Sequence, residues 1–154
     1  MQMSLIIRTA ADVLFPFIMV FGLYIVIHGH VTPGGGFQGG AILASGILLL
    51  LLAYRYEEFT RIVRMVMMKT FESTGLLLFL IAALSAMLLG AGFFYNWLFP
   101  GGLIFGEFVP FGPGPANLNT GGVIPIMNIA VGIKVLGAIG VILLALLSGI
   151  KERS

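Results

Sequence analysis

The apolar residues of this chain gather into four long runs, separated by shorter stretches rich in polar residues, glycine and proline. The runs cover residues 5–27, 37–54, 73–94 and 121–150. About 20 consecutive apolar residues in a helix cross a hydrocarbon layer roughly 30 Å thick, where only helices or closed barrels satisfy their backbone. Because the runs are continuous rather than alternating, they indicate helices. The pattern predicts an all-α integral membrane protein with one domain, residues 1–154, of four transmembrane helices.

The composition supports a lipid environment. Hydrophobic residues make up 59% of the 154 residues and charged residues only 9%, whereas soluble domains contain about 25% charged residues. The mean hydropathy of +1.11 makes the lipid bilayer the expected surrounding. The net charge of +2 is small, which argues against nucleic acid as a partner. The absence of cysteine excludes disulfides and thiolate-held metal ions.

The basic residues predict the orientation of the helices. The connections after the first and third runs contain no lysine or arginine. Seven of the eight basic residues lie near the two ends of the chain or between the second and third runs: Arg8, Arg55, Arg61, Arg64, Lys69, Lys151 and Arg153. Because positively charged segments remain in the cytoplasm, both termini and the middle connection are predicted to be cytoplasmic.

The middle connection has a helical pattern of its own. Five apolar residues recur there at intervals of three and four: Phe59, Ile62, Val63, Val66 and Met67. This spacing is typical of a short amphipathic helix at the cytoplasmic membrane surface. The alternative is that the second and third helices simply extend beyond the membrane, and the sequence leaves both interpretations open.

A glycine-rich segment, "HGHVTPGGGFQGG" at residues 28–40, leads into the second run. Pro33 and Gly34 are typical of a type II turn, in which the glycine takes a positive φ. Small residues four apart, such as Gly36 and Gly40, let another helix approach closely. Bare backbone near a membrane surface can also line an ion-accessible cavity, although a tight hairpin without ion contact is the alternative. The residues assigned to the turn and to helix packing are Pro33, Gly34, Gly35, Gly36, Phe37, Gly39 and Gly40.

Lys134 is the most unusual charge, because it lies near the middle of the fourth run. A lysine at the centre of a membrane costs about 2.5–3.5 kcal/mol on insertion scales, so it needs a counter-charge or water. Asp12 and Glu72 lie near the cytoplasmic ends of their runs. The sequence therefore predicts that another polypeptide or a chain of water supplies the partner. Contact with lipid headgroups in a tilted helix is the alternative.

Three further polar residues join Lys134 as candidates for an ion path: Asp12, His28 and His30. The two histidines are two positions apart and point in different directions on a helix, so they do not predict a shared metal ion. Each histidine suits either a proton relay or an ordinary interfacial position. The sequence contains no nucleophile–base arrangement, phosphate-binding loop or metal-ligand cluster. These features predict a non-catalytic chain without cofactors or metal sites.

The glycine-rich segment closely resembles the signature of the B subunits of Mrp (also called Mnh) multisubunit sodium/proton antiporters. The resemblance covers nearly the whole chain and includes "FGLYIVIHGH" and "GGVIPIMNIAVGIKV". Many antiporter B subunits have an acidic stretch similar to "FDLGVYLV" in the last helix, where this chain has "MNIAVGIKV". In this respect the chain looks more like the homologues in the ion modules of membrane-bound hydrogenases and related respiratory complexes.

The resemblance implies a small, non-catalytic subunit in a prokaryotic cell membrane, without a redox cofactor of its own. Its implied partners are the other membrane subunits of an Mrp-type complex, with sodium ions and protons as the transported species. The subunit would contribute to the ion path and to the packing of the module. Two alternatives are a subunit of a stand-alone Mrp antiporter and a purely structural subunit without ion contact.

Overall fold

The computed structural model describes residues 4–30, 33–54, 56–98 and 121–151. These residues form helices and turns, with no strand among them, so the predicted all-α class is confirmed. Four of the helices are long and apolar enough to cross a membrane. The helices are α1 (Leu5–His28), α2 (Gly35–Ala53), α3 (Tyr56–Ile62), α4 (Met65–Leu88) and α5 (Ile124–Lys151).

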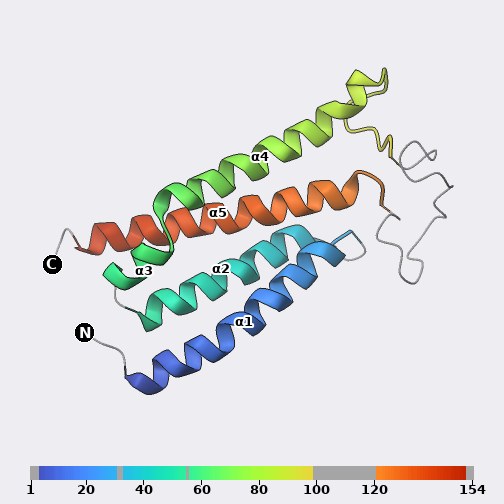
Figure 1. Cartoon of the computed structure of the whole chain (residues 1–154). Helices are drawn as coiled ribbons and strands as arrows, with labels where there is room; N and C mark the ends of the chain where they lie inside the picture. The colour runs from blue at the N-terminus through green and yellow to red at the C-terminus, as the bar shows by residue number, and fades with distance from the viewer. Residues whose placement is uncertain (1–3, 31–32, 55, 99–120, 152–154) are drawn as a thin grey trace.

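The four long helices lie side by side in a single row, in the order α1, α2, α5, α4 (Figure 1). α2 and α5 run in the same direction at the centre of the row, and each outer helix is antiparallel to its neighbour. A row one helix thick buries each helix only along its edges. Large apolar side chains are consequently exposed on its faces, among them Leu5, Ile6 and Leu88 with 79%, 81% and 89% exposure.

The start of α1, the end of α5 and the short helix α3 lie at one end of the row (Figure 1). The glycine-rich turn and the connection from α4 to α5 lie at the other end. Four crossings of a membrane require this arrangement, because an even number of crossings returns the chain to its starting side. Which end faces the cytoplasm stays a prediction from the basic residues.

The middle connection combines both of the structures that its sequence left open. A separate short helix, α3, is followed by an extended residue, Arg64, with φ −93° and ψ 142°, and α4 then begins at Met65. Phe59 and Val63 are buried, with 1% and 5% exposure, whereas Val66 is 74% exposed. The first part of the apolar stripe therefore anchors α3 against the bundle, and the later part lies on the outer surface of α4.

The described helices differ in length from the apolar runs. α4 begins eight residues before residue 73 and ends at Leu88, so Lys69 and Glu72 are inside the helix. An apolar run in the sequence ends at the first charged residue. A helix can continue past that residue, because its backbone hydrogen bonds do not depend on the charge of the side chain. α5 begins at Ile124, after a turn at Gly121–Val123.

Candidate functional site

The glycine-rich turn connects α1 to α2 at the end of the row opposite to α3. Gly34 precedes α2 with φ 77°, a left-handed conformation that glycine adopts without steric cost. The N–H of Gln38 donates to the carbonyl of Gly34 at 3.0 Å, which closes the first turn of the helix. The backbone conformation at position 34 therefore favours glycine, which is the residue found there.

The glycines of α2 form two rows, and each row faces a different helix. A Cβ atom at Gly39 would lie 2.8 Å from the backbone nitrogen of Val26 in α1. A Cβ atom at Gly40 would lie 2.7 Å from the carbonyl oxygen of Gly132 in α5. Real Cβ atoms do not approach so closely, so any side chain at these positions would push the helices apart. Gly35 lies in the first row and Gly36 in the second, and all four are buried.

Two other residues grouped with the glycines do not pack inside the chain. Phe37 is 61% exposed, and Pro33 is exposed at the turn. A phenylalanine next to glycines that face two different helices is directed to the remaining side of α2. Its ring therefore lies on a face of the row that lipid or another chain would cover.

Asn128 of α5 joins the glycine-rich turn to α1 through two short hydrogen bonds. The N–H of Gly36 donates to Oδ1 of Asn128 at 2.7 Å. The Nδ2 group of Asn128 donates to the carbonyl oxygen of Val26, also at 2.7 Å. The first N–H groups and last carbonyls of a helix lack the usual partner within the helix. Asn128 supplies the acceptor for the N–H of Gly36 and a second donor to the carbonyl of Val26, which also accepts from the N–H of Gly29 at 3.3 Å. Sequence reasoning missed this role, although an amide within an apolar run is a signal that could have revealed it.

A second asparagine, Asn96, closes the start of α5. Its Nδ2 group donates to the carbonyl of Gly121 at 3.0 Å, and the N–H of Val123 donates to its Oδ1 at 2.8 Å. Gly122, between these residues, has φ 60°. Asn96 thereby fixes the turn that leads into α5, a role that the sequence pattern did not reveal.

The two histidines have different surroundings at the end of α1. His28 is exposed and stacks on Tyr24, with 4.2 Å between the ring centroids. His30 donates from Nδ1 to the carbonyl oxygen of Ile27 at 3.1 Å, while its Nε2 atom is buried without a hydrogen-bond partner. Within the described residues, no group of three histidine, aspartate or glutamate side chains is placed to hold a metal ion.

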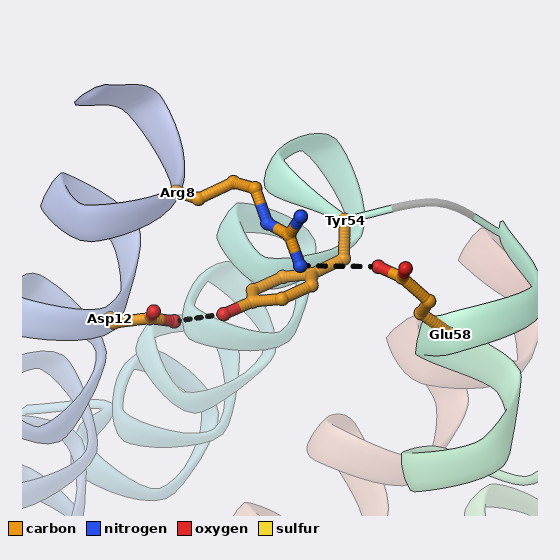
Figure 2. A network of polar contacts seen from close by, with 4 residues as sticks. All are labelled: Arg8, Asp12, Tyr54 and Glu58. Atoms are coloured by element: carbon orange, nitrogen blue, oxygen red, sulfur yellow. Dashed lines mark hydrogen bonds and ion pairs between the residues drawn. The ribbon is translucent and has the colours of Figure 1, made fainter. Parts of the chain in front are cut away.

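Asp12 belongs to a polar network at the opposite end of α1, close to α3 (Figure 2). The hydroxyl of Tyr54 donates to Oδ1 of Asp12 at 2.6 Å. The guanidinium group of Arg8 lies 4.5 Å from the centre of the Tyr54 ring, and its Nη2 is 3.3 Å from Oε2 of Glu58. The hydrogen bond to Asp12 raises the pKa of the Tyr54 hydroxyl above its ordinary value. The network ties the start of α1 to the end of α2 and to α3.

Lys134 lies on the edge of α5 that packs against α4. Within the described part of the chain, Lys134 is half-buried and forms no hydrogen bond or ion pair. A Cβ atom at Gly75 of α4 would lie 2.5 Å from the backbone nitrogen of Lys134, so the two helices meet closely at this point. The structure does not gather the four candidate ion-path residues. Asp12 and His28 alone are sixteen positions apart on α1, which is about 24 Å.

These features define a class of protein: a small helical membrane protein whose row of helices is fastened internally and left apolar on both faces. The family described as "Domain related to MnhB subunit of Na+/H+ antiporter" matches residues 6–141. The chain belongs to this family, and the resemblance drawn from its glycine-rich segment is confirmed.

Individual relatives support this assignment. The chain is 35% identical over 121 residues to an uncharacterized protein of Methanocaldococcus jannaschii, a match that covers 79% of this chain and 44% of that protein. It is 38% identical over 93 residues to the B-type subunit of a Na(+)/H(+) antiporter of Bacillus subtilis, covering 58% of this chain and 62% of that protein. The chain thus spans about half the length of these relatives.

A solved structure of a larger assembly contains a similar chain. The structure is that of the membrane-bound sulfane sulfur reductase, an archaeal respiratory membrane complex. The two chains are 35% identical with a TM-score of 0.66, and the match covers 90% of this chain and 56% of that chain. A homologous fold therefore occurs within a multisubunit respiratory complex.

Proposed function

We propose that this chain is a packing and ion-path subunit of an Mrp-type sodium/proton antiporter module within an ion-pumping respiratory complex of the cell membrane. The observation that carries this proposal is the single row of helices, with apolar faces that need cover on both sides. Its membership of the MnhB family and the similar chain in an archaeal respiratory complex support the choice of module. Both termini and α3 then face the cytoplasm.

Within the module, the chain acts without catalysing a reaction of its own. The partners of its apolar faces are other membrane subunits, and the transported species are sodium ions and protons. The α2–α5 edge, with Asn128 and the glycines, holds the row together. Lys134, which lacks a partner among the described residues, contributes to the ion path.

Purification of the tagged chain from native membranes tests the host complex. We expect antiporter-type subunits to co-purify together with redox subunits that contain iron–sulfur clusters. A tagged membrane protein of similar size and hydropathy, expressed at the same level, controls for adventitious lipid-mediated association. Recovery of antiporter subunits alone would favour a stand-alone antiporter. Recovery of the chain by itself, folded and monodisperse in detergent, would contradict membership of any complex.

The ion-path role is tested separately from membership. Lys134→Ala is expected to abolish sodium-dependent proton exchange in membrane vesicles while the purified complex keeps its full set of subunits. Lys69→Ala is the matched control, because Lys69 is an exposed lysine of α4. Loss of subunits from the Lys134→Ala complex would show instead that this lysine is structural.

A further inference from the structure

The crossing of α4 and α5 brings two oppositely charged residues to the same place. A Cβ atom at Gly75 of α4 would lie 2.5 Å from the nitrogen and 2.8 Å from the Cα atom of Lys134. A Cβ atom at Gly137 of α5 would lie 2.7 Å from the carbonyl oxygen of Met68 and 2.9 Å from the Cα atom of Glu72. Each glycine therefore lies against the backbone of a charged residue on the other helix.

The two charged residues are also at nearly the same level of the bundle. Gly75 is level with Lys134, and Glu72 is three residues from Gly75 along α4. Three residues of helix correspond to about 4.5 Å, which is less than one turn. The sequence pattern placed Glu72 too far toward the cytoplasmic end to reach Lys134. The structure places the two residues closer in depth than this expectation, because α4 begins at Met65 and the two helices cross at Gly75. A partner of Lys134 on another polypeptide stays a prediction.

Glu72 and Lys134 both lack a partner in the described part of the chain. Each is half-buried, and neither takes part in a hydrogen bond or ion pair there. Two other carboxylates of that part are occupied, Asp12 by Tyr54 and Glu58 by Arg8. A partly buried charge without a partner is costly. An ion pair between the carboxylate and the amine at this helix crossing would remove that cost for both groups.

The directions of the two side chains explain why they are apart in this structure. In a helix the Cα–Cβ bond tilts toward the helix N-terminus. α4 and α5 are antiparallel (Figure 1), so Glu72 starts toward the α3 end of the row and Lys134 toward the opposite end. Rotation of the long lysine side chain back along α5 would bring its amine toward the carboxylate.

We propose that Glu72 and Lys134 form a proton-binding charge pair that opens and closes at the α4–α5 crossing. This inference rests on the proposed ion-path function of Lys134. In the closed state the carboxylate and the ammonium group pair directly across the two glycines. A proton taken up by Glu72 removes its negative charge, and the pair opens to the arrangement seen in this structure. The site thus binds one proton at the Glu72 carboxylate for each opening.

Few other titratable side chains of the packed helices lie near this crossing. α2, on the other side of α5, contains no titratable residue. α4 contributes Lys69, one turn from Glu72 and exposed. α1 touches α5 only lightly, and its Arg8 and Asp12 are occupied in the network at its start, while Tyr24 and His28 lie at its other end.

Cross-linking tests the geometry of the pair without any measurement of transport. The chain contains no cysteine, so Glu72→Cys with Lys134→Cys introduces two unique thiols into the intact complex. We expect a short thiol-specific cross-linker to join them efficiently in native membranes, as detected by peptide mass spectrometry. Ser73→Cys with Lys134→Cys is the matched control, because Ser73 is the exposed neighbour of Glu72. Equal cross-linking of the two pairs would overturn the proposed pairing.

A double-mutant cycle tests the functional coupling. The variants are Glu72→Gln, Lys134→Gln, their combination, and the exchanged pair Glu72→Lys with Lys134→Glu, each measured as the rate of ion exchange against pH in vesicles. We expect each single change to lower the rate at least about tenfold and the combined change to cost no more than either one, because coupled residues are not additive. The exchanged pair should recover most of the exchange rate lost in either single variant. Multiplying effects in the combined variant would overturn the proposal.

The pH profile separates proton binding from sodium binding at this site. Glu72→Gln should flatten the acidic limb of the profile at every sodium concentration. A profile that is unchanged by Glu72→Gln, or one that responds to sodium but not to pH, would overturn the assignment of a proton. If the chain has no ion-path function, exchange is unaffected by all four variants, whereas the cross-linking result still reports whether the two residues meet.

Discussion

The two edges of α5 are both lined by glycine, but within the described part of the chain polar groups are hydrogen-bonded at one edge and unpaired at the other. On the α2 edge, Gly36 and Gly40 allow close approach, and Asn128 satisfies backbone groups of both α1 and α2. On the α4 edge, Gly75 and Gly137 allow an equally close approach, but the charged residues beside them remain unpaired among the described residues. Close packing is common to both edges, and only the satisfaction of polar groups distinguishes them.

This difference distinguishes a helix contact that only holds the protein together from a helix contact that also has a functional role. Buried polar groups in proteins are nearly always hydrogen-bonded, and an exception needs an explanation. In a membrane, ionisable residues within helices are costly and mark ion pathways. The α2–α5 edge therefore has the properties of a purely structural helix contact, whereas the α4–α5 edge has those of the proposed charge pair, which opens and closes. Three substitutions test this distinction and a fourth tests the attachment of α3, in order from the largest expected effect on stability to the smallest.

Gly36→Leu should have the largest effect, because its side chain would enter the space occupied by Asn128. Overpacking alone costs about 1–3 kcal/mol, and separation of the helices would also break the hydrogen bond from the Gly36 N–H. We expect little or no assembled complex by co-purification. Gly149→Leu in α5 is the matched control, because a Cβ atom at Gly149 meets no atom within 4 Å. Normal recovery of the Gly36→Leu complex would show that the α2–α5 edge is not a fastening.

Asn128→Leu should have the next largest effect, since it keeps the size of the side chain but leaves the N–H of Gly36 unpaired and the carbonyl of Val26 with only the longer bond from the N–H of Gly29. Each unsatisfied buried group costs about 1–3 kcal/mol, so we expect a clear loss in the midpoint of thermal unfolding in detergent. Ser148→Ala is a suitable control, because the hydroxyl of Ser148 bonds only to a carbonyl of its own helix. An unchanged unfolding midpoint for Asn128→Leu would mean that water replaces the amide at no cost.

Tyr54→Phe should have a smaller, local effect, limited to the attachment of α3. The variant removes the hydrogen bond to Asp12 and should speed amide hydrogen exchange in residues 56–62, while Tyr24→Phe leaves this exchange unchanged. Because pairing raises the pKa of the Tyr54 hydroxyl, its stabilising effect is complete below the ordinary tyrosine pKa of about 10 and is lost as the pH rises through the higher, folded-state value. In the wild type, the protection of α3 relative to the intrinsic, base-catalysed exchange rate should therefore fall at strongly alkaline pH. A Tyr54→Phe variant whose protection falls in the same way would contradict this cause.

Lys134→Ala should have the smallest effect on stability, although it is expected to abolish ion exchange. In the open arrangement of this structure, where Lys134 lacks a partner among the described residues, removal of its partly buried charge relieves a desolvation cost rather than breaking a bond. We expect the complex to unfold at the wild-type temperature or slightly above it, with Lys69→Ala as the control. A marked loss of stability would place Lys134 among the fastening residues and remove the contrast between the two edges of α5.

Much of the fold followed from local pattern, because apolar runs and turn residues carry their own physical signal. The four helices, the turn at Pro33 and Gly34 and the small-residue rows of α2 all depend on residues close together in the sequence. Which helix each row faces is a tertiary property, and Gly39 and Gly40 differ in it although they are adjacent. The nearness of Glu72 to Lys134 at the α4–α5 crossing could not be predicted for a related reason: the two residues are 62 positions apart, and the depth of Glu72 depends on where α4 begins. Asn128 and Asn96 likewise act on backbone groups that only the folded chain brings near.

The row is only one helix thick, and the side chains on its two broad faces can consequently vary independently of each other. A substitution on one face does not have to be balanced by a change on the other, because large side chains on the faces, such as Leu5, Ile6 and Leu88, are exposed rather than packed across the row. Such a row of helices can pack between different membrane subunits, and each face can adapt to its own partner. The occurrence of similar chains in an antiporter and in a sulfane sulfur reductase complex fits such independent adaptation of the two faces.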